Sequence, residues 1–473
     1  MRDSGTGHQP PTAHDHGTGP QPPTVHDSST GHEPPAGSST SAGTGTGIGP
    51  QSPTVHDVGT GQKPPASPST GMEQQPAAGR GSGVGVRSSR EASGMGARAG
   101  GPSPQAVADA FDATRLTQAR HLAALTKKEV AEHLGVSPAA VGQYESGVTR
   151  PRPDLIPRLA EVLAVPMAFF LPGRPHGKLD GSMAHFRSLR STRAYQRAKA
   201  VAFVEQVWEL TYALEKRVQL PLVDLPGFAG GEMHSDLPRD PAGAARALRA
   251  HWGLGTGPIG HLVRRMESHG IVVAFPRHDP DAVTVDAFST SSLPRPIVVL
   301  TPNRFDDIYR HRFTAAHELG HLVLHGDTAA GDTQQEREAD AFAAEFLTPR
   351  DSILPQLPLR ADLRRLAELR LTWGVSVDSL LYRCRETGLL SDSAAGRAYQ
   401  RLAALREQPG FTNEPVSGYP GEQPVLLAQA FELAGRESGL SAAMLAQELA
   451  WPIARVRELI GLPDRRPSLK LVP

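Results

Sequence analysis

The chain has 473 residues, and its 49 Lys and Arg residues balance its 49 Asp and Glu residues. This length has room for about three domains, while the balanced charge excludes a general electrostatic attraction to nucleic acid, so that any such contact must come from a local patch. The single cysteine, Cys384, excludes an intramolecular disulfide and a cysteine-built zinc finger, and it fits a core thiol in a reducing cytoplasm. We expect a cytoplasmic protein without membrane contact, because the sequence shows no signal peptide and no apolar run long enough to span a bilayer.

Residues 1–103 differ in composition from the rest of the chain. Gly, Pro, Ser and Thr dominate them, no Phe, Trp or Tyr occurs before Phe111, and a degenerate repeat is visible in GTGHQPPTAHD and GTGPQPPTVHD. Such a segment cannot bury enough apolar area to offset the entropy of ordering. We therefore predict a disordered tail.

Residues 104–173 have a helical pattern that predicts an all-α helix-turn-helix bundle. Within it, LTKKEVAEHLGVSPAAVGQYESGVTRP places apolar residues where two short crossed helices would bury them. Gly135 would form the tight turn between these helices, and Ser137 would cap the second one. The apolar positions to be buried are Leu125, Val130, Ala131, Leu134, Val136 and Val141.

The second helix of this pair would present its start and its exposed face to the major groove of DNA. Gln pairs with adenine, small side chains contact thymine methyl groups, and Lys and Arg contact phosphates. The candidate DNA-contacting residues are Lys127, Lys128, Ser137, Ala139, Ala140, Gln143, Tyr144 and Arg150. The predicted partner is double-stranded DNA.

The frame T-x-x-E-V-A-x-x-L-G-V-S, followed by a short helix and E-x-G, resembles the Cro/CI-type (XRE) helix-turn-helix family over roughly residues 115–172. Lys127 stands where the family usually carries Gln, which favours a phosphate contact at that position. The charge of this region is close to neutral, so we expect modest affinity that depends on a homodimer or on the basic arm that follows. The alternative is a helical bundle used only for dimerisation.

Residues 174–239 predict a basic arm and a connecting helix. Between Arg174 and Lys199 there are seven Lys and Arg residues against one acid, Asp180. A contact to the DNA backbone and a solvated linker both account for this composition, and the sequence leaves both open. The helical spacing of apolar residues in AKAVAFVEQVWELTYALEKRVQL predicts the connecting helix.

Residues 240–350 predict a small α+β domain. Two helical stretches, PAGAARALRAHW and PIGHLVRRMESHG, come before three strand candidates, IVVAFP, AVTVDAFST and RPIVVLT. AVTVDAFST would be either a sheet edge that pairs with an extended peptide or a core strand, and both interpretations stay open. Two more helices follow, RFTAAHELGHLVLH and TQQEREADAFAAEFL.

The first of these helices has the spacing of a zinc site. Residues four apart on a helix differ by about 40° around its axis, so His317 and His321 can present both imidazoles to one ion. Glu318 lies about 100° away, where it reaches a water beside the ion without binding the ion itself. A catalytic zinc ion also needs a third protein ligand and an open position.

The second helix offers that third ligand. Glu336 would complete a His-His-Glu set, and Asp340, one turn further on, would accept the outer N–H of a ligand histidine. Glu338 is the second candidate for the third ligand. His325 continues the face of the two histidines and is expected to be structural. The predicted cofactor is Zn²⁺.

RFTAAHELGHLVLH, followed by EREADAFAAEFLTP, is similar to the ImmA/IrrE family of zinc metallo-endopeptidases over roughly residues 240–350. The resemblance implies a gluzincin-like α+β fold, zinc bound by His317, His321 and Glu336, and Glu318 as the general base. It also implies a protein substrate of the helix-turn-helix repressor type, cleaved in response to stress. The chain departs from the usual LLMP at FLTP, where Thr348 replaces a Met and touches no ligand.

Residues 351–473 predict an all-α region whose last helices pack together or shape a substrate groove or dimer interface. The whole chain is then a multidomain bacterial transcriptional regulator that carries a zinc-dependent endopeptidase. It would cleave a repressor-type protein, or itself within DLPGFAGGEMHSDLP, in a stress, phage or mobile-element response. The alternative is a non-proteolytic transcription factor whose zinc domain senses a signal or binds a partner.

Overall fold

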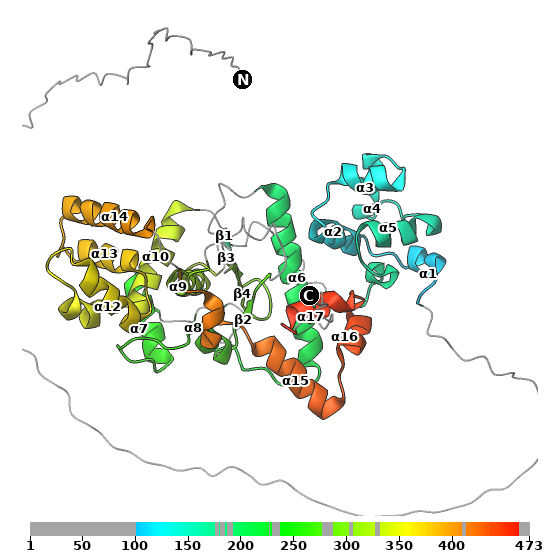
Figure 1. Ribbon diagram of the computed structural model, residues 1–473. Helices are drawn as coiled ribbons and strands as arrows, with labels where there is room; N and C mark the ends of the chain where they lie inside the picture. Colours follow the sequence, from blue (N-terminus) through cyan, green and yellow to red (C-terminus); the bar gives the residue numbers. More distant parts are fainter. Residues whose placement is uncertain are drawn as a thin grey trace, which may run out of the picture. The chain divides into compact units, whose positions relative to one another are not determined.

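The computed structural model describes residues 101–175, 179, 185–186, 193–226, 228, 237–276, 287–301, 306–326, 332–408 and 413–462, and of residues 185 and 186 only the backbone. The predicted disordered tail up to residue 100, most of the basic arm and most of DLPGFAGGEMHSDLP lie outside these residues. The described part has a helical bundle, a small mixed sheet with helices, and a helical C-terminal region (Figure 1). This confirms the predicted multidomain, mostly helical architecture.

The bundle begins the described chain. Its helices are α1 (Pro104–Asp109), α2 (Ala113–Leu122), α3 (Lys127–Leu134), α4 (Pro138–Glu145) and α5 (Ile156–Val162), with 3-10 turns at Pro153–Leu155 and Met167–Phe170. Thr126 and Glu129 form a capping box that starts α3. Gly135 ends α3 with a φ of 69°, a left-handed conformation that glycine adopts without strain.

The crossing of α3 and α4 has the core that the sequence predicts. Val130, Ala131, Leu134 and Val141 are all at most 2 % exposed, and the flanking Leu125 and Val136 are half-buried. Ser137 caps α4 by accepting a hydrogen bond from the backbone N–H of Ala140 at 3.1 Å. The two-helix pattern read from the sequence is therefore confirmed.

Four short strands form one sheet. They are β1 (His185–Phe186), β2 (Val272–Ala274), β3 (Ala287–Thr290) and β4 (Ile297–Leu300), in the order β1-β3-β4-β2. β3 is antiparallel to both β1 and β4, while β2 and β4 are parallel. The three predicted strands are confirmed where they are described; residues 282–286 of AVTVDAFST lie outside. β1, in the basic arm, was not predicted, because two residues without a β-branched run leave no strand pattern.

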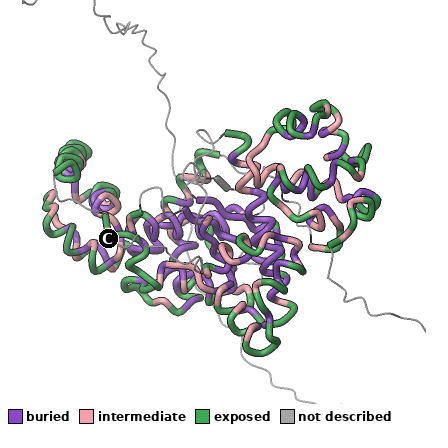
Figure 2. The backbone as a smooth tube through the Cα atoms, turned by 45° about the vertical axis from the view of Figure 1, so that its right-hand side comes forward, coloured by how far each residue is buried: buried purple, intermediate pink, exposed green. Residues whose placement is uncertain are grey.

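Every residue of β2, β3 and β4 is buried, in the buried interior coloured purple in Figure 2. Burial on both faces is why β2 and β4 are apolar at successive positions rather than alternating. Val272, Phe288 and Ile297 belong to a core that includes the helix-turn-helix bundle. Their neighbours Val273 and Ala287 belong to a second core on the other face. The sheet therefore separates two apolar cores, and β2, β3 and β4 each contribute to both.

Helix α6 (Ala194–Glu215) is more than the predicted connecting helix. Residues 201–211 are buried without interruption, and the helix packs against α2, β4 and two C-terminal helices. Glu209 on α6 accepts hydrogen bonds from the guanidinium of Arg115 and, at 2.9 Å, from the amide of Gln118, both on α2. The pair Arg115–Glu209 is at most 1 % exposed. A buried ion pair thus joins the helix-turn-helix bundle to α6.

Helices fill the space around the sheet and continue to the end of the described chain. They are α7 (Pro241–His251), α8 (Leu262–Ser268), α9 (Ile308–Leu324), α10 (Thr333–Leu347), α11 (Arg350–Ile353), α12 (Leu363–Trp373), α13 (Val377–Glu386), α14 (Asp392–Arg406), α15 (Leu426–Ser438), α16 (Ala442–Leu449) and α17 (Ile453–Leu459), with 3-10 turns at Leu354–Gln356, Val416–Gly418 and Pro420–Glu422. Side chains of α12 to α14 join the core that contains α9, and those of α15 to α17 join the core that contains α6. The second core therefore continues past residue 350. Cys384 is buried in it, and burial raises the pKa of its thiol to about 11, as expected for a core thiol.

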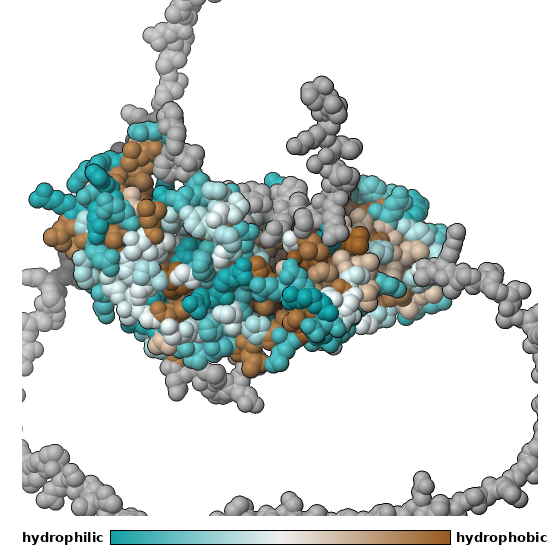
Figure 3. Space-filling view, turned by 60° about the horizontal axis from the view of Figure 1, so that its bottom comes forward, coloured by the Kyte–Doolittle hydropathy of each residue, from teal (hydrophilic) through white to brown (hydrophobic). Residues whose placement is uncertain are grey.

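Large apolar side chains that stay exposed are spread over distant parts of the sequence. Val148, Leu222, Leu359 and Leu371 are 69–77 % exposed. On the face shown in Figure 3, hydrophobic side chains are interspersed with hydrophilic ones. Single exposed apolar residues are normal on protein surfaces and do not by themselves mark an interface. The predicted homodimer stays a prediction.

The buried pair between α2 and α6 leads to a stability prediction. Glu209→Ala leaves the Arg115 guanidinium buried without its carboxylate, and we expect the free energy of unfolding to fall by about 3–5 kcal/mol. The matched control is Glu132→Ala, which removes the exposed partner of Lys128 and should change stability by about 1 kcal/mol or less. Urea unfolding of the full chain, followed by tryptophan fluorescence, measures both. Equal shifts in the two variants would contradict the assignment of Glu209 as the link.

Candidate metal centre and helix-turn-helix

The two helices that carry the candidate ligands pack closely together. Asp307 caps α9 by accepting from the backbone N–H groups of Tyr309 and Arg310, and Asp332 caps α10 by accepting from that of Gln334. Gly320 lies where α9 meets α10, and a Cβ atom added to it would lie 3.0 Å from the ring of Phe342. Because Phe342 is fully buried and cannot move aside, the glycine in HELGH sets the spacing between the two helices.

The structure brings His317, His321 and Glu336 together. The Nε2 atoms of the two histidines lie 3.0 Å apart, and the Glu336 carboxylate oxygens lie 3.5 Å from His317 Nε2 and 3.4 Å from His321 Nε2. Ligand atoms about 2.1 Å from a tetrahedral zinc ion are about 3.4 Å from one another. These three residues are the group that fits a metal ion within the described residues. The donor set and its dimensions fit zinc.

The outer ring nitrogens of both histidines have partners that orient the rings. His317 Nδ1 lies 2.8 Å from Asp340 Oδ1. His321 Nδ1 lies 3.1 Å from His325 Nδ1, and His325 Nε2 lies 2.9 Å from Glu338 Oε2. A carboxylate accepts only, so His325 donates from Nε2 and accepts at Nδ1, which makes His321 Nδ1 the donor. Both ligand histidines then carry their proton on Nδ1 and turn Nε2 toward Glu336.

These contacts separate the two candidates for the third ligand. Glu336 lies with the histidine Nε2 atoms, whereas Glu338 binds His325. Burial alone would raise the pKa of Glu336, but hydrogen bonds and charge from His317 and His321 lower it to about 2. The hydrogen bond from His325 also lowers the pKa of Glu338. Both carboxylates are therefore ionised at neutral pH, and Glu336 is the one that lies with the two histidines, as predicted for the third ligand.

Glu318 is fully buried beside this cluster. The hydroxyl of Ser289, on β3, donates to Glu318 Oε2 at 2.8 Å. This contact orients the carboxylate from the sheet side, across 29 positions of sequence. Sequence reasoning did not identify Ser289, because a serine in a strand carries no signal of its own. It also missed the role of His325 and Glu338, although the spacing of His325 four residues after His321 was a usable signal.

The helix-turn-helix places most of the predicted DNA-contacting residues at the surface. Ala139 and Gln143 are exposed, Ala140 is half-buried, and Ser137 is exposed while its hydroxyl caps α4. The expected place of Tyr144 on the exposed face is wrong. Tyr144 lies three residues after Val141, on the same buried face of α4, and is 9 % exposed. It packs in the core, and its contact to DNA stays a prediction.

The basic residues of this region differ in their contacts. The Lys127 ammonium lies 3.2 Å from Glu145, and Lys128 is 77 % exposed and lies 3.8 Å from Glu132. Arg150 donates to the backbone carbonyl of Asp109, at the end of α1. Lys128 is therefore the more available of the two lysines for a phosphate, and the DNA contacts of all these residues stay predictions.

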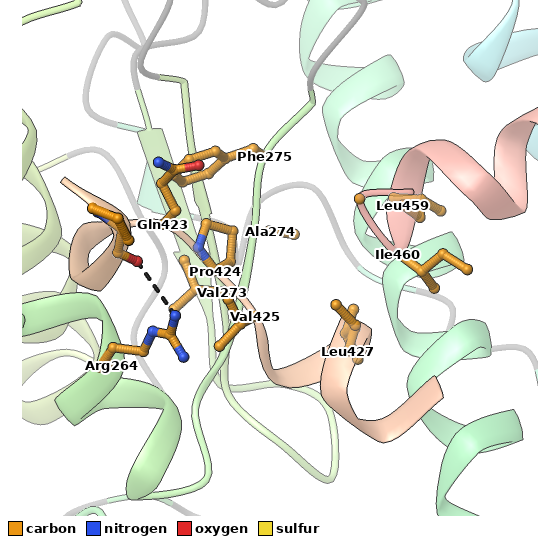
Figure 4. Close-up of a pocket in the computed structure, with 13 residues that line it drawn as sticks. Arg264, Val273, Ala274, Phe275, Gln423, Pro424, Val425, Leu427, Leu459 and Ile460 are labelled. Atoms are coloured by element: carbon orange, nitrogen blue, oxygen red, sulfur yellow. Dashed lines mark hydrogen bonds between the residues drawn. The ribbon is translucent and has the colours of Figure 1, made fainter. Parts of the chain in front are cut away.

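Two of the cavities near the second core, among the described residues, border β2 or α10. One, of about 280 Å³, lies at the outer side of β2 and is lined by Arg264, Val273 and Leu427 among others (Figure 4). Its Arg264 donates to the carbonyl of Pro420 at 3.4 Å. The other, of about 330 Å³, is lined by residues of α9, α10 and α13, including Asp340. Of these two cavities, the second borders the candidate metal centre.

Two family models match parts of the chain, each less than half of it. Residues 113–168 match the family model of a helix-turn-helix domain. Residues 266–385 match the model of a peptidase family described as the IrrE N-terminal-like domain. The chain therefore carries both domains, as the sequence resemblances indicated, and the peptidase match ends at α13, inside the second core. No curated protein matches the chain. No described helix has the length and apolarity needed to cross a membrane.

The contact chain from His321 through His325 to Glu338 leads to a metal-affinity prediction. Glu338→Gln removes the carboxylate that sets the His325 tautomer, and we expect zinc affinity to fall by about 10-fold to 100-fold. Competition with a chromophoric chelator measures it. Glu368→Gln, at an exposed position on α12, is the control and should leave affinity unchanged. A loss in Glu338→Gln as large as that in Glu336→Gln would instead make Glu338 a direct ligand.

Proposed function

We propose that this protein is a DNA-binding transcriptional regulator that carries a zinc-dependent endopeptidase. The observation that supports it most is the cluster of His317, His321 and Glu336 with the buried Glu318 beside it. Two neutral imidazoles and one carboxylate form the ligand set of many catalytic zinc sites, which keep one position open. The peptidase-family match over residues 266–385 supports the same chemistry.

Each side chain then has a defined task. His317, His321 and Glu336 would hold zinc, which when bound supplies a Lewis acid that activates water and polarises a peptide carbonyl. Glu318 accepts the proton from the attacking water and returns it to the leaving amine, as a general base and then a general acid. Ser289 holds one Glu318 oxygen at 2.8 Å and so directs the other toward the reacting water. Asp340 and His325 keep the two imidazoles in the tautomer that turns Nε2 to the ion.

The helix-turn-helix supplies the second half of the proposal. A chain that binds DNA through α4 brings the peptidase domain to the same site, where a repressor-type protein bound to DNA would be its substrate. The relief of repression by cleavage, in a stress, phage or mobile-element response, is the function that joins the two domains in one chain.

The base assignment is tested by Glu318→Gln. The amide cannot accept a proton, so we expect peptide cleavage to fall by at least about 100-fold, while bound zinc per chain stays the same. The measurement is zinc analysis together with mass spectrometry of candidate helix-turn-helix repressors incubated with each protein. Ser289→Ala, which loosens but does not remove Glu318, should show a smaller loss. Equal cleavage by the parent chain and Glu318→Gln would overturn the proposal.

The same variant separates cleavage from sensing. If Glu318→Gln binds DNA normally but no longer relieves repression, proteolysis is the signal. If regulation is unchanged, the domain acts as a sensor or partner-binding module instead.

The recognition helix is tested on DNA selected by the parent chain. Gln143→Ala should weaken binding to the selected site by about 5-fold to 150-fold and leave non-specific binding unchanged, because a base contact carries sequence information. Lys128→Ala should weaken binding to both DNAs alike and lower the slope of log K against log salt by about one. Fluorescence anisotropy at several salt concentrations measures both effects. Equal losses on both DNAs for Gln143→Ala would contradict a base contact.

A further inference from the structure

β3 is the strand that runs beside the metal centre. At Ser289 its side chain binds Glu318, and two residues further on Ser291 donates to the carbonyl of Gly326, just past the end of α9. These two contacts lay β3 along α9 from the candidate general base to the end of the helix. On one side β3 pairs with β4. The side of β3 that faces away from β4 is directed toward one edge of the sheet.

The chain itself fills that edge. His185 pairs with Ser289 and Phe186 pairs with Phe288, in antiparallel register. Paired strands lie about 4.8 Å apart, so the backbone of His185 is the next strand beyond the residue that orients Glu318. The opposite edge of the sheet, β2, is separated from β3 by β4. Of the two edges, only the one that β1 fills adjoins the strand that contacts Glu318.

A strand edge beside a peptidase site is where an extended peptide binds by adding a strand. Backbone N–H and C=O groups provide such binding, and it needs no particular side chain. Within the described residues, β1 pairs with β3 through His185 and Phe186, and a peptide that pairs along all of β3 would form more backbone hydrogen bonds than these two positions do. Such a peptide can therefore compete with these two residues for the edge of β3.

We propose that residues 185–186 hold the substrate edge of β3 in the resting protein, and that an extended, unfolded segment of the substrate protein binds by replacing them. This inference rests on the proposed function, because it takes the β3 edge as the substrate side of a peptidase. β1 belongs to the segment between the helix-turn-helix bundle and α6. The occupant of the substrate edge is thus the chain's own connection to its DNA-binding domain, and substrate binding releases that connection from the sheet.

The test measures peptide binding without cleavage, in the zinc-loaded full chain carrying Glu318→Gln. A fluorescent peptide with residues 180–191, DGSMAHFRSLRS, is the strand probe, and anisotropy gives its Kd. Replacing both His185 and Phe186 by Pro removes the backbone N–H donors of β1. We expect the probe to bind this variant at least about tenfold more tightly, because the edge is no longer filled by a tethered competitor.

A second variant and two controls keep the result interpretable. Replacing residues 181–190 by a Gly-Ser segment of equal length should give the same gain, and it replaces the first variant if the prolines prevent folding. A probe peptide with Pro at both β1 positions should bind none of the proteins. Among residues 287–290, hydrogen exchange of the N–H groups that face β1 should become at least about tenfold faster in both variants when no probe is present, while those that face β4 should not change.

Equal probe affinity in the parent and both variants, with unchanged exchange of residues 287–290, would overturn the inference. This outcome is distinct from failure of the proposed function, because no bond has to be cut. If the probe binds the variants tightly, but the chain with Glu318 intact cleaves no protein, the edge assignment stands and the peptidase proposal falls.

Discussion

A helix that is buried on nearly every side must find a partner for each polar side chain it carries, and α9 is such a helix. Near its start, His311 and Arg312 both bind Glu422, the first through the backbone carbonyl and the second through the carboxylate. Further along, Glu318 accepts a hydrogen bond from Ser289. His317 and His321 lie beside Glu336. The partners come from β3, α10 and a segment about 110 residues further on. The need to give each buried polar side chain of α9 a hydrogen-bond partner therefore fixes how the surrounding elements are placed. The candidate metal centre is one result of that constraint.

The sheet also links α9 to the DNA-binding part of the chain, because it packs against the cores of both. Its strands bury one face against the core that contains α9 and the other against the core that contains α6. Helix α6 in turn holds the helix-turn-helix bundle through Glu209 and Arg115. Removing either partner of such a pair by mutation leaves a buried charge without compensation, which destabilises the protein. The segment that links them, containing β1, also lies on the edge of β3. One small sheet thus contacts both the candidate catalytic site and the connection to the DNA-binding domain.

Local signals account for what the sequence predicted well. The turn at Gly135, the cap at Ser137 and the two histidines four apart depend on residues within one or two helical turns, where spacing alone settles which side chains meet. The partner of Glu318 could not be predicted, because Ser289 is far away in sequence and ordinary in type. Tyr144 was misplaced for a related reason: its position on α4 allows both a surface and a core location, and only packing against the other helices of the bundle decides between them.

The sequence by itself determined the two domain types, the placement of His317, Glu318 and His321 on one helix, and the next helix as the source of a third candidate ligand. These features follow from the fixed geometry of the α-helix, which relates sequence spacing to position in space. Tertiary structure alone placed Glu336 rather than Glu338 beside the two histidines, paired His325 with Glu338, buried α6, and laid residues 185–186 along β3. Each of these depends on contacts between segments that the chain brings together only on folding, and no local periodicity encodes them.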